Sequence, residues 1–120
     1  MQPDARDAAY LWDMLDAARA VQEFVAPRSL SDYVADRMLR GAVERHLEII
    51  GEAANRVSRG FRAAHPEIPW QSMIAQRNVL SHEYGDIENT LVWRVATLRI
   101  PELIHQLETL LPPQPPQPDA

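Results

Sequence analysis

Hydrophobic residues recur every three or four positions along most of the chain, a pattern that predicts helices and not strands. The first such segment covers residues 4–24, where Asp4 can accept hydrogen bonds from the free amides of the first helical turn. Pro27 ends the segment. The apolar stripe of this helix consists of Tyr10, Leu11, Met14, Leu15, Ala18, Val21 and Val25.

A second, longer helix is predicted from Leu30 to Arg56. Ser29 and Asp32 have the spacing of a capping box, with aspartate in place of the usual Glu or Gln. Gly51 lies inside this helix, either as a close packing contact or as a tolerated weak point. The predicted buried face consists of Val34, Met38, Leu39, Ala42, Val43, Leu47, Ile50, Ala53, Ala54 and Val57.

Residues 58–69 contain a glycine and two prolines and are expected to form a connector. Phe61 and Ile68 are expected to fold back onto the core, and His65 to lie in a turn. A third helix is predicted from Trp70, with its end between Leu80 and Gly85.

The last helix is expected to begin at Asp86 or Glu88, and Pro101 should kink it because proline removes one backbone donor. Residues 112–120 hold five prolines in nine positions, which predicts a disordered or polyproline II tail. The helical domain then spans residues 1–111. The predicted fold is an all-α, up-and-down four-helix bundle with a kinked last helix.

The composition fits one soluble domain, since no apolar run approaches the ~20 residues of a membrane span. The first residues carry acids and do not form a secretory signal. The chain has no cysteine, which fits a reducing compartment, so we expect a cytoplasmic protein.

The formal net charge of −5 argues against a broad nucleic-acid-binding surface. All twelve basic residues are arginine, a residue suited to bidentate phosphate binding. Arg56, Arg59, Arg62 and Arg77 lie close together in the sequence. They are compatible with a local basic patch that would contact a few phosphates and not a long backbone track.

The octet RNVLSHEY at residues 77–84 carries the candidate chemistry. Arg77 can neutralise a phosphate, His82 can transfer a proton near pH 7, and Tyr84 is a phenol that can be modified. Five helical residues rotate by about 500°, so Arg77 and His82 would lie roughly 140° apart on a regular helix. Either the helix ends between them, or one of them points elsewhere, or a second copy of the chain completes the pocket.

Other site classes are not indicated. His46, Glu48 and Glu52 lie near one another, but no second histidine or further cluster accompanies them, so no metal site is expected. The sequence has no glycine-rich phosphate loop and no nucleophile elbow. The three tryptophans occupy apolar helical positions and are expected to be core or boundary residues.

Three blocks, IIGEAANRVS at 49–58, HPEIPW at 65–70 and RNVLSHEYGDIENTLVW at 77–93, resemble the HepT-like toxin family of the HEPN superfamily in order and spacing. The resemblance extends from the first helix to about Leu111. Its centre is the motif Arg-x4-His-x-Tyr, and the proline-rich tail is not part of it.

The resemblance implies the toxin of a type VII toxin–antitoxin module, a metal-independent endoribonuclease that needs no cofactor. It implies a homodimer that acts on RNA, without DNA or a membrane, and a nucleotidyltransferase antitoxin that attaches AMP to Tyr84. Arg77 and His82 correspond to the catalytic pair, Asn78 matches the family pattern beside them, and Glu52 is a supporting candidate. Arg56, Arg59 and Arg62 are the candidate contacts for RNA phosphates.

Each site residue also has a structural interpretation. Arg77 can pair with Glu52 across the bundle, His82 can cap the third helix, and Asn78 can bond a free carbonyl at the helix end. Two other functions remain open. One is a non-catalytic dimer that binds nucleotide or its nucleotidyltransferase partner, which the acidic net charge favours. The other is the helical half of a split nucleotidyltransferase.

Overall fold

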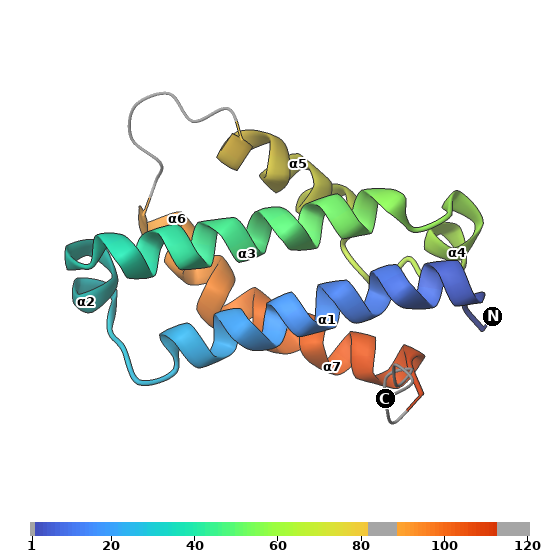
Figure 1. Cartoon of the computed structure of the whole chain (residues 1–120), viewed down its shortest axis with the longest axis horizontal. Helices are drawn as coiled ribbons and strands as arrows, with labels where there is room; N and C mark the ends of the chain where they lie inside the picture. Colours follow the sequence, from blue (N-terminus) through green and yellow to red (C-terminus); the bar gives the residue numbers. More distant parts are fainter. Residues whose placement is uncertain (1, 82–88, 113–120) are drawn as a thin grey trace, which may run out of the picture.

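The computed structural model describes residues 2–81 and 89–112, the side chains of residues 77–81 excepted, and all regular structure in this part of the chain is helical. Four main segments run alternately up and down, which confirms the predicted bundle (Figure 1). They are α1 (Ala5–Val25), α3 (Arg37–Arg56), α5 (Trp70–Ser81) and a last segment made of α6 (Asn89–Arg94), η1 (Val95–Arg99) and α7 (Ile100–Leu110). Two short helices, α2 (Leu30–Ala35) and α4 (Arg59–Ala64), lie at opposite ends.

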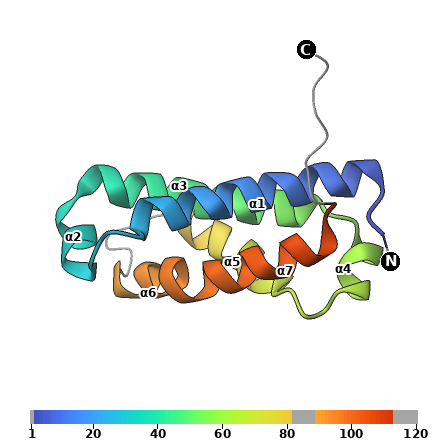
Figure 2. The same cartoon turned by 90° about the horizontal axis from the view of Figure 1, so that it is seen from below.

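The bundle is built around the lengthwise pairing of α1 with α3 (Figures 1 and 2). Helix α5 packs against α3, and α7 packs against α1. The apolar stripe of α1 lies at the centre, where Leu11, Met14 and Val21 are completely buried. The two largest fully buried side chains, Tyr33 and Phe61, come from the short helices at the two ends. The short helices therefore close the core at both ends.

The predicted starts of the first two helices are confirmed. The Asp4 carboxylate accepts a hydrogen bond from the Asp7 amide at 2.8 Å. The Ser29 amide donates to the Asp32 carboxylate at 2.9 Å, and the Asp32 amide donates to Ser29 Oγ at 3.1 Å. Aspartate therefore completes a reciprocal capping box as Glu or Gln would.

The single long helix predicted over residues 30–56 is wrong, because the chain is extended at Asp36. The Asp36 carboxylate accepts a hydrogen bond from the Leu39 amide at 3.1 Å and starts a new helix. The break changes the helical register, so Val34 and Met38, predicted to be buried, are 45% and 86% exposed.

The predicted connector contains the short helix α4. Ser58 Oγ accepts a hydrogen bond from the Phe61 amide at 3.2 Å and caps this helix. Phe61 and Ile68 are 1% and 2% exposed, so their predicted burial is confirmed. His65 directly follows α4 and ends it, as expected for a turn residue.

The last helical segment is irregular next to Pro101, where the sequence predicts a kink. Residues 95–99 form a π-helical stretch just before Pro101, and the Ile100 amide donates to the Val95 carbonyl. Such a stretch is a recognised origin of helix kinks. The predicted start at Asp86 or Glu88 and the tail at residues 113–120 lie outside the described residues.

Candidate functional site

The motif Arg-x4-His-x-Tyr, formed by Arg77, His82 and Tyr84, is named the reactive motif. Its first half lies on α5. Arg77 and Asn78 belong to the last turns of this helix, whose described part ends at Ser81. His82 and Tyr84 lie outside the described residues. The structure thus defines the helix that carries the motif and the surfaces beside it.

The start of α5 is fixed by contacts to α4 and to the preceding connector. The buried Trp70 indole donates from Nε1 to the His65 carbonyl at 2.9 Å. The Phe61 ring meets the edge of Trp70 at a centroid distance of 6.4 Å. Met73, one turn further along, is 8% exposed, and α5 packs against α3 along its length. These contacts set the direction in which α5 leads to the motif.

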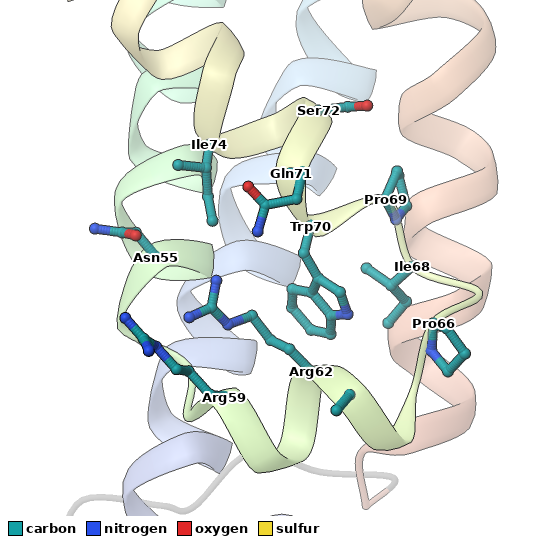
Figure 3. Close-up of a pocket in the computed structure, with 11 residues that line it drawn as sticks. Asn55, Arg59, Arg62, Pro66, Ile68, Pro69, Trp70, Gln71, Ser72 and Ile74 are labelled. Carbon is teal, nitrogen blue, oxygen red and sulfur yellow. The ribbon is translucent and has the colours of Figure 1, made fainter.

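A cavity of about 680 Å³ lies between α4 and the start of α5 (Figure 3). Arg59 and Arg62 are one helical turn apart on α4, so they share a face. Of the described residues that line the cavity, none is Asp or Glu. The lining comprises Asn55, Arg59, Arg62, Ala63, Pro66, Ile68, Pro69, Trp70, Gln71, Ser72 and Ile74. We name it the basic pocket.

The positive charge of the basic pocket is not neutralised within the described part of the chain. No ion pair there joins Arg59 or Arg62 to a carboxylate. Arg62 Nε is buried and has no hydrogen-bond partner among those residues. Figure 3 shows both guanidinium groups directed to the side of the pocket where Asn55 and Gln71 lie. The pocket therefore presents donors and positive charge together.

Arg56 lies on a different surface from Arg59 and Arg62. It lines a cavity of about 370 Å³ between α1 and α3, together with Tyr10 and Glu52. Hydrogen bonds from Arg6 and, more weakly, from Arg56 hold the pKa of Tyr10 below its usual value. The three arginines that are close in the sequence are therefore divided between two surfaces.

Glu52 also belongs to the cavity between α1 and α3. Its carboxylate lies 3.8 Å from the Arg45 guanidinium, and Arg45 lies 2.8 Å from Glu48. Glu52 therefore forms an ion pair with Arg45, a residue of its own helix. A pairing of Glu52 with Arg77 stays a prediction, since the Arg77 side chain is outside the described ones.

A third cavity, of about 580 Å³, is mainly apolar and lies between α3, α5 and the last helical segment. Its lining includes Leu47, Met73, Leu91 and Leu103. Leu91 is 54% exposed, although it is a large apolar residue. We name this cavity the apolar groove, and it borders the same helix that carries Arg77 and Asn78.

The sequence interpretation missed a buried carboxylate that holds α4 in place. Asp7 on α1 is 5% exposed and accepts hydrogen bonds from the Ser58 amide at 2.8 Å and from Ser58 Oγ at 2.6 Å. The sequence signal for this arrangement is Ser58, a residue type that commonly caps helices. A helix that starts after Ser58 places Arg59 and Arg62 on one face.

Two further site classes can be checked in the described part of the chain. It contains no group of three or more His, Cys, Asp or Glu side chains that could hold a metal ion. Among its helices, none combines the length and the apolar character needed to cross a membrane.

Comparison with known proteins gives the family. The profile described as "Ribonuclease HepT-like" matches residues 14–110. A Methanocaldococcus jannaschii protein whose name marks it as a candidate RNase is 36% identical over 83% of this chain and 92% of its own length. A Thermococcus cleftensis protein named probable ribonuclease HepT is 36% identical over 84% and 92%. No solved structure matches significantly. The chain belongs to the HepT-like ribonuclease family.

Proposed function

We propose that this protein is a metal-independent endoribonuclease that acts as the toxin of a type VII toxin–antitoxin module in the cytoplasm. The observation that carries the proposal is the reactive motif within a family match over residues 14–110. Arg77 lies in the last turns of a helix that is fixed at its start, and His82 directly follows the last described residue of that helix. Family membership and motif thus point to the same chemistry.

The reaction needs one base and one group that stabilises negative charge. His82 takes the proton from an RNA 2′-hydroxyl, since the ordinary pKa of imidazole is near the working pH. The 2′-oxygen attacks the adjacent phosphorus, and the bond from phosphorus to the 5′-oxygen breaks. Arg77 holds the phosphate and stabilises the charge that develops on its oxygens. The products are a 2′,3′-cyclic phosphate and a 5′-hydroxyl end.

Asn78 and Glu52 are proposed to support this site. Asn78 orients His82 or donates a hydrogen bond to a phosphate oxygen. The described interactions of Glu52 are with its own helix, so we assign it a structural role near the site. Arg59 and Arg62 are proposed to contact RNA phosphates in the basic pocket, whereas Arg56, the third arginine predicted for this role, shares its cavity with Asp13, Asp16 and Glu52 and is not retained as a contact.

A homodimer is proposed because the leaving 5′-oxygen needs a proton donor that the motif of one subunit does not readily supply. A two-fold axis would bring two copies of the motif to one cleft. The apolar groove beside α5 supports this arrangement, because it leaves Leu91 largely exposed next to the helix that carries the motif. A second copy would cover this surface.

The antitoxin is proposed to be a nucleotidyltransferase that transfers AMP to Tyr84. The Tyr84 hydroxyl attacks the α-phosphorus of ATP and pyrophosphate leaves. The added phosphodiester brings a negative charge and a bulky nucleoside two residues from His82. Charge repulsion would then exclude an RNA phosphate from Arg77.

The test measures RNA cleavage and intact mass on the same preparation, made with and without the nucleotidyltransferase. Unmodified protein should cleave RNA to cyclic phosphate ends, and activity should disappear when the mass rises by one or more AMP units. His82→Ala and Arg77→Ala should both be folded and inactive. Full cleavage by either variant would refute the mechanism.

A non-catalytic dimer that binds nucleotide or its nucleotidyltransferase partner is the alternative, and the net charge of −5 favours it. In that case Tyr84 is only an attachment point. Unmodified, folded protein that leaves RNA ends unchanged would establish this alternative.

A further inference from the structure

The basic pocket contains a buried donor for which the described part of the chain provides no acceptor. A buried N–H group without a partner costs about 1–3 kcal/mol, and more when it is charged. Arg62 Nε is such a group. A guanidinium offers five N–H donors in one plane, an arrangement that matches the oxygens of a phosphate. Because Nε is closed off from solvent, a polyoxygen anion would bind the terminal guanidinium nitrogens, which Figure 3 shows directed to the side of the pocket where Asn55 and Gln71 lie.

The first turn of α5 adds to this preference. Gln71 and Ser72 line the pocket. In this helix the Met73 amide donates to the Pro69 carbonyl, and the amides of Gln71 and Ser72 lie before this bond in the sequence. Among the described residues neither amide has a backbone acceptor. Free amides and the helix dipole both favour an anion at a helix start.

The walls of the pocket are held before any ligand binds. Ser58 and Asp7 fix the start of α4, and the Trp70 indole is bonded to the His65 carbonyl. On the far side of the connector, Gln106 Nε2 donates to the Glu67 carbonyl at 3.0 Å. A ligand would thus meet a preformed site and would lose little affinity to reorganisation.

Helix α5 links the pocket to the reactive motif. Asn78 follows Gln71 by about two helical turns, roughly 10.5 Å along the axis, and so returns to the same side of the helix. Each phosphate of a stacked strand advances about 3.4 Å along the helix axis and lies farther than this from its neighbour through space, so the distance corresponds to at most about three nucleotides. A single RNA strand can therefore reach both places.

We propose that the basic pocket holds one backbone phosphate of the RNA substrate, at most about three nucleotides from the phosphate that is cleaved. Arg59 and Arg62 contact this phosphate, and Asn55 and Gln71 border it. The assignment rests on the proposed ribonuclease function. A free mononucleotide has the same phosphate chemistry, so the experiment separates the two sources.

The experiment measures binding without cleavage, in the full-length His82→Ala protein. Fluorescence anisotropy with a short labelled single-stranded oligoribonucleotide gives the Kd at several salt concentrations. Arg59→Gln together with Arg62→Gln should weaken binding about tenfold to a hundredfold. The slope of log affinity against log salt should become shallower by about 0.7, the value for one phosphate contact on a single strand.

The matched control is the pair Arg19→Gln and Arg28→Gln, which removes the same charge from exposed arginines that are paired with Glu108 and Asp36. This control should change the salt slope little. Asn55→Asp is a second test variant, because it adds a negative charge at an exposed residue of the pocket and should also weaken binding. Circular dichroism verifies that every variant is folded.

Unchanged RNA binding by the Arg59/Arg62 double variant and by Asn55→Asp would overturn the proposal, even if the protein cleaves RNA. Equal loss in the control pair would also overturn it, because the effect would then be one of net charge. AMP that binds the pocket as tightly as the oligoribonucleotide would assign it to a free nucleotide instead. RNA that binds through the pocket but is never cleaved would support the subsite and refute only the proposed catalysis.

Discussion

The buried hydrogen bonds between Asp7 and Ser58 should contribute strongly to stability. Asp7 is 5% exposed and accepts from the Ser58 amide at 2.8 Å and from Ser58 Oγ at 2.6 Å. A hydrogen bond to a charged group contributes about 1.5–3 kcal/mol, but two bonds to one carboxylate are not additive. Asp7→Ala would also leave the Ser58 amide without its acceptor. We expect it to lower the free energy of unfolding by about 3 kcal/mol.

Ser58→Ala removes one bond to Asp7 and the cap of α4, where Ser58 Oγ accepts from the Phe61 amide. Its expected cost is about 2 kcal/mol. Because both variants delete the same contact, the double variant should cost less than their sum, with a coupling energy of about 1 kcal/mol or more. This coupling separates the contact itself from a general loss of packing.

Urea unfolding followed by circular dichroism measures these values by linear extrapolation. Asp16→Ala is the control, since Asp16 is an exposed acid on the same helix and should change stability by less than about 0.5 kcal/mol. Amide hydrogen exchange at α4 should accelerate in Asp7→Ala but not in Asp16→Ala. A cost for Asp7→Ala equal to that of the control, or a coupling energy of zero, would refute the reasoning.

Three further predictions concern other parts of the bundle. Burial raises the pKa of Tyr33 above its usual 10, so stability should fall as pH rises above about 10, and Tyr33→Phe should flatten that fall in alkaline urea titrations. Ser29→Ala should cost about 1 kcal/mol in the same unfolding assay, since it removes half of the capping box of α2. Leu91→Glu should dissociate the proposed dimer in light scattering, whereas Leu98→Glu, 63% exposed but not among the residues of the apolar groove, should not.

The helices of this fold could be predicted because they depend on local signals. The three-to-four spacing of apolar residues, Asp4 and the Ser29–Asp32 box all act within one or two turns. Pro101 marked the irregular last segment for the same reason, since its missing donor affects only the preceding turn.

The break at Asp36 could not be predicted because tertiary contacts decide it. A continuous helix was compatible with the apolar pattern, but the separate helix α2 completely buries Tyr33, whose ring lies 5.4 Å from that of Trp93. That contact joins residues far apart in the sequence. The Asp7–Ser58 pair, on two helices that the sequence pattern alone does not bring together, is a second case.

The candidate site divides in the same way. The motif with Arg77, His82 and Tyr84 can be identified from the sequence alone, and the family match supports its interpretation as a ribonuclease motif. The basic pocket cannot be predicted from the sequence alone. It depends on α4, a helix within the segment that the sequence predicts as a connector, and on the position of Trp70 beside that helix.

The distribution of charge explains how an acidic chain could bind RNA. The cavity between α1 and α3 gathers Asp13, Asp16 and Glu52, whereas the described lining of the basic pocket carries arginines and no acid. An RNA strand would therefore be attracted at one end of α5 and repelled elsewhere, which orients it along the helix that leads to Arg77. Binding through one phosphate in the pocket and one at the motif predicts a shallow salt slope of about −1.4. A broad basic surface would give a much steeper dependence, so the slope itself distinguishes local recognition from general attraction.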